Sequence, residues 1–122
     1  MTALRNFLTT LTIASAIALP ATAKAGFVPV KTKTEFLKII QGKNLKYSGA
    51  SIHLSKAGKI IGRAYGKKVS GTWQWKGNMF CRSIIWGSRD LGPNCEVVKV
   101  DGKTLRFITD HGKGKRADMS LR

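Results

Sequence analysis

Few side chains in this chain could act as a catalytic acid or base. The acidic residues are Glu35, Asp90, Glu96, Asp101, Asp110 and Asp118. None of them forms a closely spaced pair such as D-x-D or E-x-x-E, the pattern that two-carboxylate catalysis would favour. Two of them, Glu35 and Asp101, also suit structural roles in a helix cap and a turn. The acids therefore predict no catalytic pair.

Motifs for nucleophilic, metal or phosphate chemistry are missing as well. His53 and His111 lack the H-x-x-x-H spacing of a helical metal site. No G-x-S-x-G elbow surrounds a serine. The segment GKGKR, residues 112–116, differs from the G-x-x-x-x-G-K-[ST] phosphate loop and is better explained as a basic hairpin turn. We therefore expect no catalytic residues, no cofactor and no metal.

The chain is short and strongly basic. Its 122 residues carry 22 Lys and Arg against 6 acidic residues, a formal net charge of +16. One domain of ordinary size fits this length, whereas a two-domain dehydrogenase, a TIM barrel or a kinase does not. Hydrophobic residues make up 43% of the chain, which is enough for a core and excludes a disordered basic tail.

Residues 1–25 have the pattern of a secretory signal peptide. Arg5 precedes an apolar run, Phe7 to Leu19, which contains no acidic residue and ends before Pro20. Ala23 and Ala25 supply the small residues that a signal peptidase requires, so we expect cleavage after Ala25 or, alternatively, after Ala23. The apolar run is too short to cross ~30 Å of hydrocarbon as a helix. We therefore expect no transmembrane segment in the mature chain.

Cleavage after Ala25 would leave residues 26–122 as a single domain, periplasmic or secreted, with 20 basic and 6 acidic residues and a net charge of +14. A domain of this size buries a modest core and often needs a disulfide. We expect the two cysteines, Cys81 and Cys95, to form one. The alternatives are a redox pair or a metal site, but the spacing is not C-x-x-C and no third and fourth ligands lie near.

One short helix and a run of strands are predicted for this domain. Thr32 and Glu35 match a capping box, an apolar side follows, and Gly42 can end the helix, so we predict a helix over 33–41. Later segments alternate between apolar and polar residues and are separated by turn signals. The predicted strands are 51–55, 59–65, 69–76, 79–86, 95–100, 103–110 and 117–121.

The fold class follows from this order of elements. No helix-length segment interrupts the strands, so we expect a mainly β fold with an antiparallel meander. The economical architecture is a curled sheet or a small open barrel, with the N-terminal helix closing one end.

Two hairpin turns give the register of the central strands. If Gly77-Asn78 is a two-residue turn, Trp75 faces Phe80 and Trp73 faces Arg82. The side of these strands that carries the aromatic residues is the most apolar, so we assign it to the core.

The second turn makes a similar prediction. If Asp101-Gly102 is a two-residue turn, Val98 faces Leu105 and Glu96 faces Phe107. Both registers place Cys81 and Cys95 on the face opposite the core, as a disulfide between neighbouring strands requires.

These registers put two charges, Arg82 and Glu96, on the core side. A buried charge is costly unless it is paired, so we predict an Arg82–Glu96 contact with Arg82 also near the face of Trp73. The functional alternative is an arginine that holds an anionic ligand inside a cavity.

Basic residues are expected to gather at one end of the meander, because its successive turns alternate between two ends. We take this end as the candidate for binding an anion, since clustered like charge focuses the electrostatic potential. The alternative is that these basic turns are merely solvated. The candidate residues are Lys67, Lys68, Arg89, Lys113, Lys115 and Arg116.

Several motifs resemble a family of small exported proteins of alphaproteobacteria. Their W-x-W, F-C-R, spaced Cys and L-R-F signature is similar to Trp73-Gln74-Trp75, Phe80-Cys81-Arg82, Cys95 and Leu105-Arg106-Phe107. The resemblance covers most of the mature chain and implies export, the disulfide and the domain type. Some members are labelled dihydrodipicolinate reductase, an activity that needs a βαβ nucleotide-binding unit with a glycine-rich turn. This sequence contains no G-x-G-x-x-G, so we do not expect that activity.

Three functions follow, in order of preference. The first is a non-enzymatic periplasmic binding module whose basic rim binds an anionic envelope polymer or an acidic protein. The second is a small-ligand carrier with a cavity near Arg82. The third is an enzyme such as the reductase. Nucleic acid is not an expected partner of an exported chain. A cavity of a few hundred Å³ beside Arg82 would favour the carrier, and a solid core would exclude it.

Overall fold

The computed structural model describes residues 26–122, so the predicted signal peptide lies outside the described residues. Two short helices and nine strands make up this part of the chain. Their bounds are β1 Val28–Pro29, α1 Lys33–Ile40, β2 Leu45–Tyr47, β3 Ala50–Leu54, β4 Lys59–Ala64, β5 Lys67–Lys76, β6 Met79–Trp86, β7 Arg89–Asp101, β8 Thr104–Ile108, α2 Thr109–Gly112 and β9 Arg116–Leu121.

Eight of the strands form a closed antiparallel barrel. From β2 to β9 each strand pairs with the next one in the chain, and β2 pairs with β9 to complete the ring. Strand β1 pairs with β7 opposite Lys99 and Val100, beyond the part of β7 that β6 covers. The predicted antiparallel meander is confirmed, and it curls far enough to close. Within residues 26–122, no helix has the length and apolarity needed to cross a membrane.

Helix α1 begins where the sequence predicts. Thr32 is the N-cap, and its hydroxyl accepts a hydrogen bond from the Glu35 amide at 3.2 Å. The Glu35 carboxylate accepts from the amide of Lys31, one residue before the cap, and not from Thr32 as a capping box would have it. The helix ends at Ile40, and Gly42 follows it with a φ of +68°.

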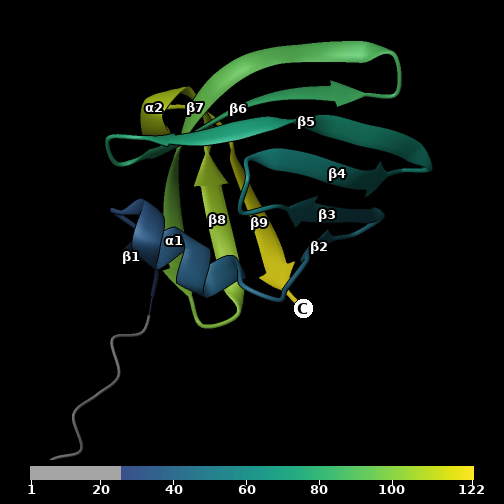
Figure 1. Cartoon of the computed structure of the whole chain (residues 1–122). Helices are drawn as coiled ribbons and strands as arrows, with labels where there is room; N and C mark the ends of the chain where they lie inside the picture. The colour runs from purple at the N-terminus through teal and green to yellow at the C-terminus, as the bar shows by residue number, and fades with distance from the viewer. Residues whose placement is uncertain (1–25) are drawn as a thin grey trace, which may run out of the picture.

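Helix α1 closes one end of the barrel, as predicted. Figure 1 shows it at the left, away from the turns that join β2 to β3, β4 to β5 and β6 to β7, which lie at the right. Its Phe36 is fully buried, and ring centroids of Trp73, Trp75, Phe80 and Phe107 lie 5.1–6.5 Å from its own. Aromatic rings therefore fill this end of the core.

The β5–β6 hairpin has the predicted register. Trp73 pairs with Arg82 and Trp75 with Phe80 across the Gly77-Asn78 turn. On the other face, Cys81 lies directly opposite Cys95 of β7, and the two form a disulfide with a Cα–Cα distance of 4.0 Å. The predicted disulfide is confirmed.

The predicted β7–β8 register is wrong by two residues. Asp101 pairs with Thr104, so the turn residues are Gly102 and Lys103, and Val98 faces Phe107. Of these two residues only Gly102 has a positive φ. A type II′ turn requires a positive φ at its first central residue alone, whereas the predicted type I′ turn requires it at both. A shift of two residues leaves every side chain on its predicted face.

Two predicted loops are largely strand. The β6–β7 hairpin turns at Gly87-Ser88, and β7 begins at Arg89. Gly92 and Pro93 suggest a break in this segment, but a bulge opposite Ser83–Ile85 accommodates the extra residues within the strand. Likewise the β4–β5 turn is Tyr65-Gly66, both with positive φ, so Lys67 and Lys68 already belong to β5.

We expect Phe36→Ala to lower the free energy of unfolding by about 3–5 kcal/mol, because it empties the centre of the aromatic cluster. Urea denaturation of the purified protein measures this loss. The control is Ile61→Ala, whose side chain is 54% exposed on the wall of β4 and should change stability by less than about 0.5 kcal/mol. Equal losses for the two variants would contradict the role given to α1.

Candidate functional site

Arg82 and Glu96 form an ion pair inside the barrel wall. Arg82 Nε donates to Glu96 Oε1 at 3.0 Å, and Arg82 Nη1 donates to the Gly92 carbonyl at 3.1 Å. Their side chains are only 13% and 9% exposed. The predicted contact is present, although the cation that lies over the Trp73 ring is Lys33, at 5.9 Å, and not Arg82.

Burial dominates the titration of Glu96. Removal from water raises the pKa of its carboxyl above the ordinary 4.5, and the charge and hydrogen bond of Arg82 oppose this rise without cancelling it. The negative charge of Asp110 adds to the rise. Glu96 is therefore a buried acid that holds its proton more firmly than an exposed one.

A cavity of about 240 Å³ lies beside this pair, inside the barrel. Aliphatic and aromatic side chains make up nearly all of its lining, and Arg82, Glu96 and Thr109 supply its polar groups. The barrel is thus hollow next to Arg82. We call this space the interior cavity; its lining residues are Leu45, Ile52, Leu54, Ile60, Val69, Phe80, Arg82, Ile84, Glu96, Phe107, Thr109, Ala117 and Met119.

The interior cavity opens to the surface at the end away from α1. A larger hollow of about 660 Å³, here called the mouth, shares Ile52, Val69, Ile84, Ala117 and Met119 with the cavity. Volumes of this size are typical of small-molecule sites. The remaining mouth residues are Tyr47, Ala50, Ala64, Tyr65, Trp86, Leu91, Arg116 and Asp118.

The mouth exists because the barrel closes along a short seam. Strand β2 pairs with β9 at Leu45–Leu121 and Lys46–Ser120, and just beyond the strands Asn44 and Arg122 exchange two backbone hydrogen bonds, whereas β8 pairs with β9 over five residues. Beyond Tyr47 the chain turns into β3, so the first residues of β9 have a strand neighbour on one side only. Ala117 faces the barrel interior by strand alternation yet is exposed, as the gap requires.

Aromatic side chains surround the mouth. The Trp86 ring reaches across β5, where its Nε1 donates to the Ala64 carbonyl at 2.8 Å. Tyr65 meets it edge to face, with ring centroids 6.4 Å apart. Tyr47, Tyr65 and Leu91 are 53%, 62% and 45% exposed, although each carries a large apolar surface.

Three basic residues, here called the rim cations, border the mouth: Lys67, Arg89 and Arg116. Lys67 Nζ lies 4.8 Å from the centroid of the Trp86 ring. Arg89 pairs with Trp86 across the Gly87-Ser88 turn, and Arg116 lines the mouth directly. In residues 26–122 the salt bridges are Arg82–Glu96 and Arg106–Asp118, so none of the rim cations is held in one. Asp118 also lines the mouth, where the charge of Arg116 helps to lower the pKa of its carboxyl.

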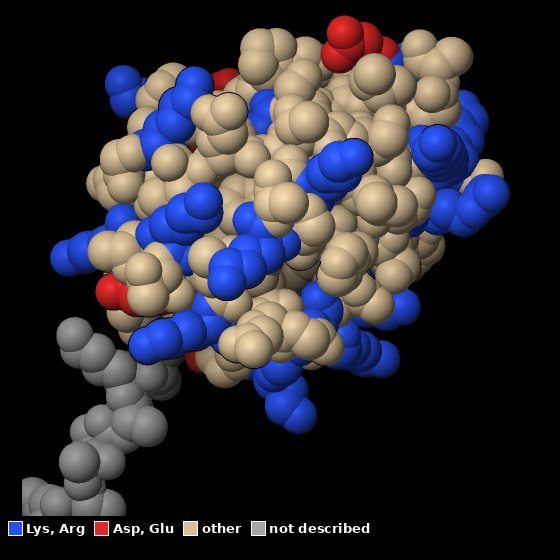
Figure 2. Space-filling view, viewed as in Figure 1, with Lys and Arg blue, Asp and Glu red and all other residues tan. Residues whose placement is uncertain are grey.

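The other predicted anion-binding residues lie less close to the mouth. Lys68 points outward on β5 by strand alternation, and its carbonyl accepts from the Gly87 amide. Lys113 and Lys115 follow α2 in a loop beside β7. Figure 2 shows Lys and Arg spread over the whole visible face, with few acids. The predicted basic end is therefore one part of a generally basic surface.

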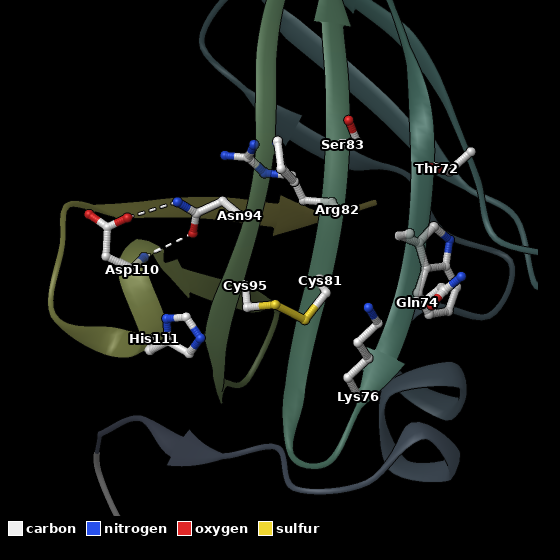
Figure 3. A pocket seen from close by; sticks show the side chains of 12 residues that line it. Thr72, Gln74, Lys76, Cys81, Arg82, Ser83, Asn94, Cys95, Asp110 and His111 are labelled. Carbon is white, nitrogen blue, oxygen red and sulfur yellow. Dashed lines mark hydrogen bonds between the residues drawn. A yellow bond between two sulfur atoms is a disulfide. The ribbon is translucent and has the colours of Figure 1, made fainter.

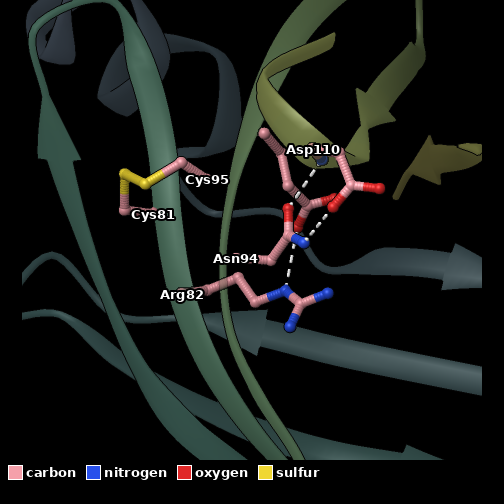
Figure 4. The surroundings of a disulfide bond; sticks show 6 residues. Cys81, Arg82, Asn94, Cys95 and Asp110 are labelled. Carbon is pink, nitrogen blue, oxygen red and sulfur yellow. Dashed lines mark hydrogen bonds and ion pairs between the residues drawn. A yellow bond between two sulfur atoms is a disulfide. The ribbon is translucent and has the colours of Figure 1, made fainter. Parts of the chain in front are cut away.

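The loop that contains α2 is strained and braced. Asp110 and His111 have φ values of +54° and +58°, which are uncommon for residues other than glycine. Asn94 holds the loop with two hydrogen bonds: its Oδ1 accepts from the Asp110 backbone amide, and its Nδ2 donates to the Asp110 carboxylate. Figure 4 shows these bonds beside the disulfide.

A third hollow, here called the outer groove, lies on the outside of β5, β6 and β7. It measures about 450 Å³, and Figure 3 shows the disulfide between Lys76 on one side and His111 on the other. The amides of Lys113 and Gly114 bond to carbonyls within the loop, so the GKGKR segment is not a phosphate loop. Within the described part of the chain, no group of three His, Cys, Asp or Glu residues could hold a metal ion.

No protein-family model, curated protein or solved structure matches this chain. The resemblance to exported alphaproteobacterial proteins therefore stays a prediction. All strand pairings in residues 26–122 are antiparallel, so this part of the chain has no βαβ unit for the nicotinamide cofactor of a reductase.

Sequence reasoning found Arg82, Glu96 and part of the rim, but it missed the apolar side of the mouth. Tyr47 belongs to a three-residue strand that was not predicted, and Leu91 was assigned to a loop. Tyr65 beside Gly66 was the available signal, since a large aromatic residue in a tight turn faces solvent.

We expect Glu96 to make the protein less stable as the pH rises. The carboxyl has a higher pKa in the folded than in the unfolded state, so its contribution to stability is largest below 4.5 and is lost as the pH rises through the folded value. The difference in unfolding free energy between the wild type and Glu96→Gln, measured in urea across this range, should change in the wild type's disfavour as the pH increases.

Asp118 supplies the opposite control. The hydrogen bond from Arg106 lowers its pKa below 3.8, so its contribution is present above that value and disappears as the pH falls. Asp118→Asn should therefore be less stable than the wild type at neutral pH, and the difference between the two should shrink only towards the acid end. A wild-type advantage over Glu96→Gln that grows with rising pH would contradict the assignment for Glu96.

Proposed function

We propose that this domain is a carrier that binds a small amphipathic anion. The apolar part of the ligand would occupy the interior cavity, and its anionic group would lie among the rim cations. The proposal joins the two non-enzymatic functions that the sequence suggests, a basic rim and a cavity near Arg82, at one site.

The observation that carries the proposal is the continuity of the interior cavity with the mouth. The two hollows share five lining residues, so a ligand could extend from the surface to the Arg82–Glu96 pair without displacing the core. Their lining is predominantly apolar, and transfer of a hydrocarbon group from water into such a space is favourable by ~25 cal/mol per Å².

The distribution of charge supports an anionic group at the rim and not at the floor. At the floor, Glu96 already satisfies Arg82, and an anion placed there would compete with a buried carboxylate. At the rim, Lys67, Arg89 and Arg116 are exposed and form no salt bridge among the described residues. The large positive net charge would also raise the encounter rate with an anion.

The proposal fits a periplasmic or secreted location, which stays a prediction for this chain. A polyanion or an acidic protein bound by charge alone would need neither the cavity nor the aromatic mouth. Such binding would also depend on basic residues over the whole surface, and this difference makes the two functions separable.

We expect the purified protein to bind dodecanoate with a Kd on the order of 10 μM, since a ligand of this size gains a fraction of a kcal/mol per heavy atom. Isothermal titration calorimetry or quenching of tryptophan fluorescence measures it. Ala117→Trp, which fills the passage from mouth to cavity, should weaken binding at least about tenfold. The matched control, Ala57→Trp in the β3–β4 turn, should leave it unchanged.

Neutralisation of the rim tests the other half of the proposal. Lys67→Gln combined with Arg89→Gln and Arg116→Gln should weaken dodecanoate binding and reduce its dependence on salt. The control is the same change at Lys56, Lys59 and Lys103, which lie away from the mouth. Absence of dodecanoate binding by the wild type, or equal binding by Ala117→Trp, would overturn the proposed function.

A further inference from the structure

The mouth has a second property that ligand binding alone does not require. The described residues include six exposed large hydrophobic side chains, and three of them, Tyr47, Tyr65 and Leu91, line the mouth. The other three, Val28, Ile61 and Ile85, do not. Half of these exposed side chains are therefore concentrated around one opening.

The position of these side chains leaves them free to meet a flat surface. Tyr65 occupies the tip of the β4–β5 hairpin. Tyr47 is the last residue of β2, just before the β2–β3 turn, which lies at the same end of the barrel. Both turns lie together at the right of Figure 1, at the end away from α1. The projecting groups are thus tips of the barrel and not residues of a closed groove.

The rim cations lie among these tips. Lys67 follows the Tyr65 turn directly and contacts the Trp86 ring, while Arg89 starts β7 two residues before Leu91. Tyrosine and tryptophan favour the interface between lipid and water, and nearby Lys and Arg are attracted to anionic headgroups. This combination of exposed aromatic and basic side chains is typical of peripheral membrane contact.

We propose that the mouth docks on the surface of an anionic lipid bilayer. The positive charges of the rim cations favour an anionic bilayer over a neutral one. The side chains of Tyr47, Tyr65 and Leu91 enter the headgroup region. The inference rests on the proposed function for its purpose: a mouth held against the bilayer lets an amphipathic anion pass between lipid and interior cavity without crossing water.

Vesicle sedimentation tests the docking. The protein is recovered after export and its N-terminus is read by mass spectrometry, so that all variants begin at the same residue. It is mixed with vesicles of phosphatidylcholine alone, or with vesicles in which a third of the lipid is phosphatidylglycerol. We expect binding to the anionic vesicles that exceeds binding to the neutral ones at least about tenfold. Equal binding to both would overturn the docking proposal.

Two matched pairs of substitutions locate the contact. Tyr65→Asn with Leu91→Gln removes two mouth tips, and Asn tolerates the left-handed turn position that Tyr65 occupies at φ +51°. Ile61→Asn with Ile85→Gln removes two side chains of similar exposure, 54% and 43%, from the outer wall. The mouth pair should weaken vesicle binding roughly tenfold and the wall pair less than about twofold. Equal effects of the two pairs would overturn the proposal.

The charge variants separate docking from general attraction. Neutralisation of the rim cations should weaken vesicle binding more than neutralisation of Lys56, Lys59 and Lys103, and equal losses would contradict docking through the mouth. Ala117→Trp distinguishes this inference from the proposed function, because it should lose dodecanoate binding and keep vesicle binding. Vesicle binding without dodecanoate binding by the wild type overturns only the carrier, and the reverse result overturns only the docking.

Discussion

The packing of Phe36 against four aromatic rings is the interaction on which the rest of the structure depends. It fills one end of the barrel with the largest side chains of the core, Trp73, Phe80 and Phe107 among them. Towards the other end the inward residues are smaller, as at Ile52, Val69 and Ala117. An eight-stranded barrel is just wide enough for side chains to fill it, so a fall in side-chain volume along its length leaves a cavity. The solid end and the hollow end are two results of one distribution of residues.

The Arg82–Glu96 pair lies where these two parts meet. Glu96 pairs across the strands with Phe80 of the aromatic cluster, and the same two residues line the interior cavity. A buried ion pair of this kind adds little net stability, because the cost of desolvation offsets the attraction. Its value is geometric: Arg82 also bonds the Gly92 carbonyl at the bulge of β7, so the pair fixes the wall from which Leu91 projects into the mouth.

Local signals in the sequence were sufficient for most of the fold. The Gly77-Asn78 turn and the aromatic alternation around it gave the β5–β6 register, and the opposite parity of Cys81 and Cys95 gave the disulfide face. The turn at Gly102 lies one residue later than predicted, which shifts the register by two, because Asp-Gly is compatible with more than one turn position. Strand β2 could not be predicted, since its three residues are held by pairing with β3 and with distant β9. The mouth depends on that pairing, so its apolar lining was beyond reach of local patterns.

The short seam between β2 and β9, two strand pairs and the flanking Asn44–Arg122 hydrogen bonds, has a consequence for how the protein fails. Every other junction of the ring joins strands by five or more residue pairs except β2–β3, which a tight turn connects. A barrel that opens would therefore part at β2–β9 and become a flat sheet with two free edges. Unpaired edges are templates for strand addition from another molecule. The same short closure that creates the mouth thus leaves self-association, through β2 and β9, as the nearest misfolded state.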